Sequence, residues 1–335
     1  MSAHPADQQL TRVVTLDDSA AAQAVFGPLH RHLAHIQEAF RDPNAPRGKP
    51  AYSVALDASG DQVTVRAQTP ADLDRATRIF ETLITQFRQK GRVREGDVLA
   101  AISFSEGAKG GRALTLPQLG GLTLRTPRQV HYVEALRDER LDLIFGVGPA
   151  GTGKTFLAVA AAVEALRAGR FERIVVTRPA VEAGEKLGYL PGDFEEKVDP
   201  YFAPIWDAFR SQMGENDLRN RRDRKQIEVA PIAFMRGRTL ANAFVIVDEA
   251  QNATILQMKM ILTRLGEGAR MVVTGDPSQV DLPSGQASGL AHALSILAGE
   301  PGVEVIRFAA QDVVRHRLVA RIINAYERAE RGHGE

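Results

Sequence analysis

The chain has 335 residues, of which 44% are hydrophobic and 25% are charged, a composition that is ordinary for a globular protein with a buried core. Its formal net charge of +1 at pH 7 excludes a strongly basic overall surface, so any patch that binds nucleic acid must be local. The sequence has no cysteine and no apolar run of the roughly 20 residues that a membrane helix needs, which excludes disulfides, thiolate chemistry and membrane-spanning helices.

Local composition predicts four parts. Residues 1–10 lack the apolar core of a secretory signal, and we expect them to form a disordered tail. Residues 107–113 are rich in glycine and basic residues, which is typical of a flexible linker. The linker separates a small α/β module, residues 11–106, from a larger domain, residues 114–335.

The small module is expected to combine helices with a short sheet. Apolar residues recur at helical spacing over residues 17–26 and 29–40. Alternating apolar residues on both sides of a turn-rich segment predict a hairpin over residues 52–65. Pro70 then begins a helix whose apolar face extends to Phe87.

In the larger domain, short apolar runs alternate with helical segments. This alternation predicts an α/β fold in which helices cover both faces of a parallel sheet. The runs that we expect to form strands are residues 141–146, 173–177, 244–247, 270–274 and 303–308.

A basic segment lies between the second and third of these runs. A solvated helix or loop is the favoured interpretation, and a contact with nucleic acid is the alternative. Its cations are Arg219, Arg221, Arg222, Arg224 and Lys225.

The first predicted strand is followed by a complete G-x-x-x-x-G-K-[ST] pattern and then by a helical segment. Glycines let successive N–H groups face one anion, and the helix N-terminus adds partial positive charge. Lys154 is expected to reach the β- and γ-phosphates, and the hydroxyl of Thr155 to ligate Mg²⁺. The nucleotide-binding residues predicted here are Gly148, Pro149, Ala150, Gly151, Thr152, Gly153, Lys154 and Thr155.

The strand predicted over residues 244–247 ends in two acids. Asp248 is placed to hold Mg²⁺, as a strand-end aspartate does in P-loop enzymes. Glu249 is the candidate to orient and polarise an attacking water. Because Glu249 can accept a proton from water, hydrolysis is favoured over phosphoryl transfer to a small acceptor.

Two glutamines are further candidates. Gln279 follows the strand over residues 270–274 and can contact a γ-phosphate if that strand lies between the P-loop strand and the Asp248 strand; the alternative is a turn with no further role. Gln129, ahead of the P-loop strand, can bind the adenine edge, although most glutamines are surface residues. The sequence lacks the Asn-Lys-x-Asp run that reads guanine, which favours ATP.

Together these motifs resemble the PhoH-like (phosphate-starvation-inducible) ATPase family, which is related to the first RecA-like domain of superfamily one helicases. The resemblance covers about residues 114–326, in the expected order. The segments that carry it are 126–129 (TPRQ), 148–155 (GPAGTGKT), 177–180 (TRPA), 187–193 (LGYLPGD), 234–239 (FMRGRT), 248–252 (DEAQN), 275–279 (GDPSQ) and 312–316 (DVVRH).

This resemblance implies a RecA-like P-loop domain that uses ATP and Mg²⁺, a small KH-like N-terminal module and a homo-oligomeric ring, expected to be a hexamer. It also implies a link to single-stranded RNA and to a YbeY-type endoribonuclease. Near the module, the Gly-x-x-Gly spacing with which KH domains clamp nucleotides occurs only at Gly107–Gly110, in the linker. RNA binding by the module and a role in oligomerisation or partner docking therefore both stay open.

Related helicases place an arginine from a second motor domain against the γ-phosphate. Only a charged tail follows Tyr326, so we expect neither a second motor domain nor a PIN-type nuclease, and an arginine from a neighbouring subunit would be required. For each candidate, a salt bridge or a solvent-facing position is the simpler interpretation. The candidates are Arg236, Arg238, Arg264 and Arg315.

The expected function is Mg²⁺-dependent ATP hydrolysis by a cytoplasmic oligomer linked to RNA metabolism, as a helicase, a remodeller or the partner of an endoribonuclease. The alternative is an oligomeric scaffold that is gated by nucleotide and turns over little. A small-molecule kinase is disfavoured, because Glu249 serves water and no acceptor pocket can be identified.

Overall fold

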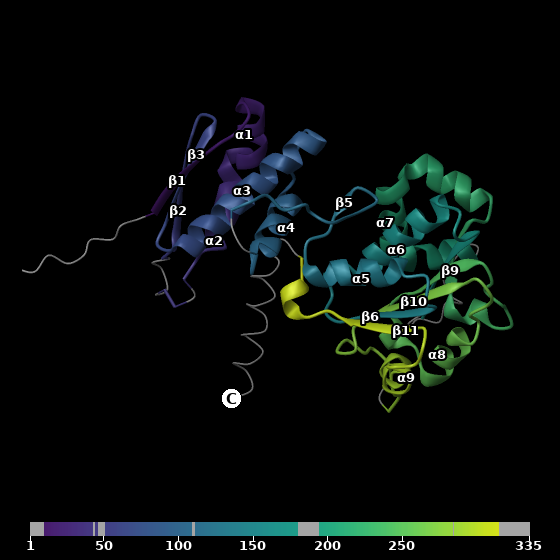
Figure 1. The fold of residues 1–335 in the computed structure, drawn as a ribbon. Helices are drawn as coiled ribbons and strands as arrows, with labels where there is room; N and C mark the ends of the chain where they lie inside the picture. Colours follow the sequence, from purple (N-terminus) through teal and green to yellow (C-terminus); the bar gives the residue numbers. More distant parts are fainter. Residues whose placement is uncertain are drawn as a thin grey trace, which may run out of the picture. The chain divides into compact units, whose positions relative to one another are not determined.

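The computed structural model describes residues 10–42, 44–45, 51–108, 111–179, 194–283 and 285–314, apart from the side chains of 194–200. Two compact units make up the chain, Met1–Pro127 and Arg128–Glu335, and each is described by itself (Figure 1). Among the helices of the described ranges, none combines the length and the apolar character that crossing a bilayer requires.

The N-terminal unit begins with a three-stranded antiparallel sheet of order β1-β3-β2, against which helices pack. The order strand, helix, helix, strand, strand, helix is that of a KH-like module, as expected. The strand β1 starts within the predicted tail and was not anticipated. The elements are β1 (Leu10–Thr15), α1 (Ser19–Phe26), η1 (Pro28–His30), α2 (Arg31–Glu38), β2 (Val54–Ser59), β3 (Gln62–Ala67), α3 (Pro70–Lys90) and α4 (Glu95–Ser105).

Local chemistry explains these boundaries. The Thr69 side chain caps α3 by accepting from the backbone N–H of Asp72 at 3.1 Å, and Pro70 occupies the first turn. The helix ends at Gly91, whose left-handed backbone (φ 64°) costs no Cβ clash. In β3, Val63 and Val65 are buried while alternate residues face outward, which is the period of a sheet with one covered face.

Residues 114–123 belong to the N-terminal unit. They include a small hairpin, β4 (Gln118–Leu119) and β5 (Leu122–Thr123). The backbone N–H of Leu114 donates to Thr82 Oγ1 at 2.9 Å, and Thr123 donates to Asp97 at 2.6 Å. The division after Pro127 therefore lies later than the linker predicted over residues 107–113, because these polar contacts are long-range and leave no compositional signal.

The larger unit contains a six-stranded parallel sheet of order β11-β6-β10-β9-β7-β8. All five predicted strands are confirmed, and β8 is an additional edge strand. The elements are α5 (Pro127–Arg137), β6 (Leu143–Val147), α6 (Lys154–Arg167), β7 (Arg173–Arg178), α7 (Phe194–Asp223), β8 (Ile227–Pro231), η3 (Ile232–Met235), β9 (Ala243–Val247), η4 (Ala250–Asn252), α8 (Ile255–Leu262), β10 (Arg270–Gly275), α9 (Gly289–Leu297), β11 (Val303–Arg307) and η5 (Ala310–Asp312).

The central strands β6, β9 and β10 are buried along their whole length, as in a parallel sheet covered on both faces. Figure 1 shows α6 and α7 on one side of this sheet and α8 and α9 on the other. The strand β10 lies between β6 and β9, which is the arrangement of a RecA-like α/β fold. Because all six strands are parallel, the loops at their carboxyl ends meet at one edge, where α/β folds bind ligands.

Candidate functional site

The P-loop connects β6 to α6 at this edge, and close packing fixes its shape. Gly148 has φ 136°, and a Cβ there would lie 2.3 Å from the carbonyl oxygen of Phe308, so only glycine fits. Gly153 (φ 88°) precedes α6, whose first residue is Lys154. The Lys154 ammonium is folded over the loop and donates to the carbonyl oxygens of Gly148 at 2.6 Å and Pro149 at 2.8 Å. These are bonds that a phosphate can replace.

Asp248 links β9 to β10 and to the start of α6. It follows β9 and is buried, and its Oδ1 accepts hydrogen bonds from Thr155 at 2.6 Å and from Thr274 of β10 at 2.8 Å. The hydroxyl at the start of α6 and the carboxylate at the end of β9 are therefore in contact, so the two residues expected to ligate Mg²⁺ lie together. Hard oxygen ligands in small number suit Mg²⁺, which keeps several waters and binds through one or two protein groups. The residues fit the ion.

Glu249 lies beside Asp248 but faces other partners. Its Oε1 lies 3.1 Å from Arg178 Nη2, and its Oε2 accepts from Gln251 Nε2 at 2.6 Å. The Glu249 backbone is left-handed (φ 50°, ψ 39°), a strained conformation for a residue other than glycine that is common at functional sites. The predicted base is thus positioned by a bent backbone and two donors.

A buried glutamine joins β9 to β10. The Oε1 of Gln251 accepts from the backbone N–H of Asp276 at 3.1 Å, and a Cβ at Gly275 would lie 2.7 Å from the same oxygen. Gln279, the glutamine predicted to sense phosphate, is exposed in the turn after β10, where its N–H donates to the Asp276 carbonyl. The buried amide beside the Glu249 carboxylate is therefore that of Gln251, whereas the role of Gln279 stays a prediction.

The helix α5 lies against the P-loop. Gln129 is buried and donates from its Nε2 to the carbonyl oxygen of Thr152 at 3.0 Å, so the predicted adenine-binding residue is in contact with the loop. One turn later, the Tyr132 ring packs edge-on against Phe308. Burial, and then the charge of Asp248, raise the pKa of the Tyr132 phenol.

Comparisons with known proteins agree with this geometry. The family described as PhoH-like protein matches residues 121–327. The chain is 48% identical over 261 residues to a PhoH-like protein of Bacillus subtilis (strain 168), covering 76% of this chain and 81% of that protein. It is 46% identical over 204 residues to Protein PhoH of Escherichia coli (strain K12), covering 60% and 57%.

The chain belongs to the PhoH-like protein family. It is a P-loop NTPase by fold and by motif. Among solved structures, the UvsW helicase of bacteriophage T4 aligns with a TM-score of 0.33 and 13% identity, covering 58% of this chain and 64% of that chain, a likeness too small to carry an argument.

The arginines proposed to act in trans occupy different surroundings in this PhoH-like chain. Arg238 forms a two-pronged pair with Glu228, which it holds at a lowered pKa, and Arg264 donates to the carbonyl oxygens of Met260 and Arg238. Arg236 is exposed, and its guanidinium makes no ion pair within the described part of the chain. Arg315 lies outside the described residues, as do parts of the motifs at 177–180, 187–193 and 312–316.

The basic segment ends α7 and continues into the turn before β8. Arg221 pairs with Asp217 at 2.8 Å, and the Arg222 guanidinium lies 4.2 Å from the centre of the Trp206 ring. The remaining cations of the segment are exposed, and the structure shows no acidic partner for them among the described residues. They are Arg219, Arg224 and Lys225.

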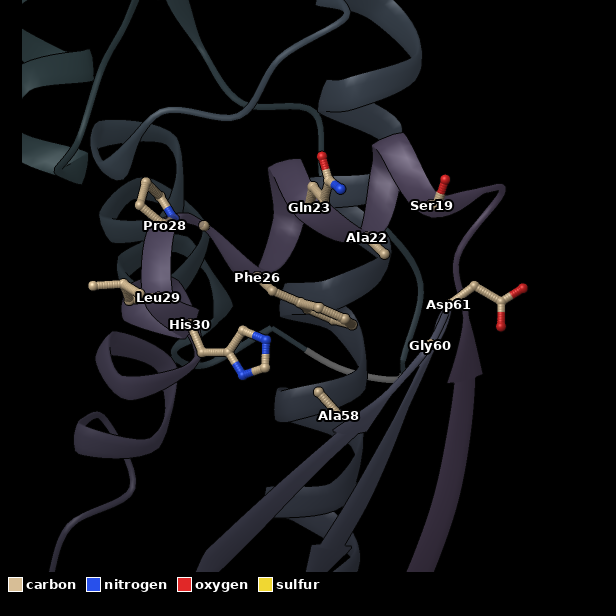
Figure 2. Close-up of a pocket in the computed structure, with 11 residues that line it drawn as sticks. Ser19, Ala22, Gln23, Phe26, Pro28, Leu29, His30, Ala58, Gly60 and Asp61 are labelled. Atoms are coloured by element: carbon tan, nitrogen blue, oxygen red, sulfur yellow. The ribbon is translucent and has the colours of Figure 1, made fainter.

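The N-terminal unit has a groove of its own, with a volume of about 890 Å³, between α1, the turn after it and the β2–β3 hairpin (Figure 2). The connection between the two helices, where a KH domain carries its Gly-x-x-Gly loop, is Gly27-Pro28-Leu29-His30, so the second glycine is replaced. Leu29 and His30 are both left-handed, and Leu29 is fully exposed.

The Gly107–Gly110 spacing follows α4 and does not lie between α1 and α2, and Gly110 is outside the described residues. Figure 2 shows the Phe26 ring projecting into the groove opposite Ala58. The residues that line it, all within the described ranges, include acidic Asp61 but no lysine or arginine. Nothing in this lining neutralises a nucleic-acid backbone.

Proposed function

We propose that this chain is a Mg²⁺-dependent ATPase whose turnover is coupled to RNA, and that it works as a cytoplasmic oligomer. The observation that carries the proposal is the 2.6 Å contact between the Thr155 hydroxyl and the Asp248 carboxylate, with Glu249 next in the chain. A strand-end aspartate linked to the P-loop hydroxyl and followed by a base is the arrangement that nucleotide hydrolysis requires. ATP is favoured as the nucleotide because Gln129 contacts the P-loop and no guanine-reading run is present.

In this proposal the chain mainly positions groups and neutralises charge. The Lys154 ammonium exchanges its loop carbonyls for the β- and γ-phosphates, and the loop N–H groups bind the same oxygens. Thr155 and Asp248 are the residues that would hold Mg²⁺, and the ion would offset the negative charge of the phosphates. Glu249 accepts the proton of the attacking water.

The link to RNA is supported by charge on the larger unit and not by the N-terminal groove. Exposed Arg219, Arg224 and Lys225 offer cations for phosphates at the end of α7, whereas the groove is lined by none. A YbeY-type endoribonuclease is the partner that the family resemblance suggests. The competing proposal is a nucleotide-gated scaffold, in which ATP changes assembly and turnover stays low.

Phosphate release from Mg-ATP, with and without single-stranded RNA, tests the proposal, with Lys154→Ala as the blank. RNA stimulation that disappears in the variant supports an RNA-coupled ATPase. Basal release that is indifferent to RNA, together with assembly that follows ATP, favours the scaffold. Release that is unchanged by Lys154→Ala would sink the assignment of the site.

The oligomer is proposed to complete the site with an arginine from a neighbouring subunit. Arg236 is the first to test, because it is exposed and unpaired within the described residues. The sharpest design mixes two inactive variants, Arg236→Ala and Glu249→Gln. Regained hydrolysis in the mixture, where an intact site meets an intact arginine across an interface, supports action in trans, and a mixture no more active than its components contradicts it.

A further inference from the structure

Arg178 was not among the predicted site residues, yet it contacts both acids of the site. It is the last residue of β7, and its Nη2 lies 3.1 Å from Glu249 Oε1 while its Nε lies 3.8 Å from Asp248 Oδ2. Its Nη1 donates to the backbone carbonyl of Tyr201 in α7 at 2.7 Å. The guanidinium is therefore held by the backbone of a neighbouring helix and directed at the proposed base.

The position of β7 in the sheet determines on which side of β9 this contact lies. The order β6-β10-β9-β7 places the P-loop strand on one side of β9 and Arg178 on the other. The pair thus holds the Glu249 carboxylate toward β7, on the side of β9 opposite to the P-loop strand. Gln251 holds the second oxygen of the same carboxylate at 2.6 Å, so both oxygens are engaged.

We propose that Arg178 is a latch on Glu249. In the resting enzyme the Arg178 guanidinium holds the Glu249 carboxylate in an ion pair. When a phosphate oxyanion binds the guanidinium instead, the carboxylate is released and can accept a proton from water. Arginine binds carboxylate and phosphate with the same planar fork, so the exchange replaces one ion pair by another. The Arg178 side chain is 24% exposed, which leaves it accessible to such an anion.

The inference rests on the proposed function, because a latch on Glu249 matters only if Glu249 serves hydrolysis. Two sources can supply the oxyanion: the γ-phosphate of ATP and the backbone of single-stranded RNA. Arg178 is a positioning residue in either case, because it acts through Glu249. The two sources differ in what remains of RNA stimulation after the latch is removed.

The test is steady-state hydrolysis by Arg178→Gln with and without single-stranded RNA. The latch predicts that basal kcat rises about fivefold while KM for ATP stays unchanged, the size expected for removing one partly exposed ion pair. If RNA then stimulates no further, RNA is the releasing anion. If RNA stimulation persists at the wild-type ratio, the γ-phosphate of ATP is the releasing anion.

Three variants serve as controls. Arg173→Gln removes an arginine from the opposite end of β7 and should leave basal kcat unchanged. Arg178→Lys keeps the positive charge but loses the planar fork, so its basal kcat should lie between those of the wild type and Arg178→Gln. It also tests the latch if Arg178→Gln folds poorly. The double variant Arg178→Gln/Glu249→Gln should be inactive, because the gained turnover passes through Glu249.

A basal kcat that is unchanged or lower in a folded Arg178→Gln or Arg178→Lys protein would overturn the latch while leaving the ATPase proposal intact. Failure of the proposed function looks different. In that case the wild-type protein releases no phosphate with or without RNA, and there is no turnover for Arg178 to restrain.

Discussion

The carboxyl edge of the large sheet and the N-terminal groove differ in how their residues are held. At the carboxyl edge of the large sheet, Asp248 is bonded to Thr155 and Thr274, so α6, β9 and β10 share one carboxylate. In the N-terminal groove, an apolar floor is bordered by few polar side chains, and the lining holds one acid, Asp61, but no lysine or arginine. The first region is the one proposed to bind phosphate, and the lining of the second offers no lysine or arginine for that role.

This difference shows that a unit can share the topology of a known domain without the side chains that bind the ligand of that domain. The N-terminal unit has the strand and helix order of a KH-like module, but His30 stands where the loop would have its second glycine. In the large unit, by contrast, the sheet order of a RecA-like fold occurs together with the P-loop and the acidic side chains at the carboxyl edge of the sheet. The predictions below test that contrast, from the largest expected effect to the smallest.

Lys154→Ala should weaken ATP binding roughly 100-fold, because the ammonium makes charge-assisted hydrogen bonds worth about 3 kcal/mol to phosphate oxygens. Titration with a fluorescent ATP analogue measures the affinity. The matched change in the N-terminal groove, His30→Ala, should leave the affinity for ATP unaltered. An equal loss in the two variants would erase the contrast between the regions.

Replacing the three exposed cations of the basic segment, Arg219, Arg224 and Lys225, with glutamine should lower affinity for single-stranded RNA about tenfold. The slope of log affinity against log salt should fall by about 2, because each phosphate contact on a single strand contributes about 0.7. Fluorescence anisotropy across a salt series measures both quantities. The control, Gln23→Ala with Leu29→Ala in the groove, should change neither.

The reverse result, with RNA affinity lost in the groove variant and retained in the basic-segment variant, would move RNA binding to the KH-like module. The contrast between the two regions would then be wrong.

The smallest effect concerns the turn that borders the groove. Gly27 (φ 71°) and Gly60 (φ 60°) both have a positive φ, but a Cβ at Gly27 would lie 2.5 Å from the His32 ring, whereas a Cβ at Gly60 would meet nothing within 4 Å. Gly27→Ala should therefore destabilise the protein by about 1 kcal/mol more than Gly60→Ala, since both carry the backbone cost and only one also displaces His32. Urea unfolding measures the difference, and equal values would mean that the turn adapts freely.

Much of the larger unit could be predicted from sequence, because its signals are local. Buried parallel strands appear as short β-branched runs, and the P-loop is a continuous motif, so β6, β9 and β10 and the position of the P-loop between strand and helix were expected. The edge strand β8 was missed because its residues are only partly buried and its pattern is weak.

Long-range side-chain contacts could not be predicted in the same way. Arg178 and Gln251 reach Glu249 only because β7 lies next to β9 and the chain turns sharply after it. A signal did exist for Arg178, since a charged residue at the carboxyl end of a buried parallel strand lies at the edge where ligands bind. The exposed position of Gln279 had no such signal, because a polar turn looks the same in the sequence whether it faces the site or solvent.

The measurement that tests the central claim most directly compares ATP binding and phosphate release in Glu249→Gln. The account predicts that binding stays within about twofold of wild type while single-turnover release slows by at least about 100-fold, as expected for loss of a general base. Glu267→Gln, a change at an exposed loop glutamate, should alter neither. Normal binding with normal release in Glu249→Gln would contradict the assignment of this carboxylate and, with it, the latch that Arg178 is proposed to form.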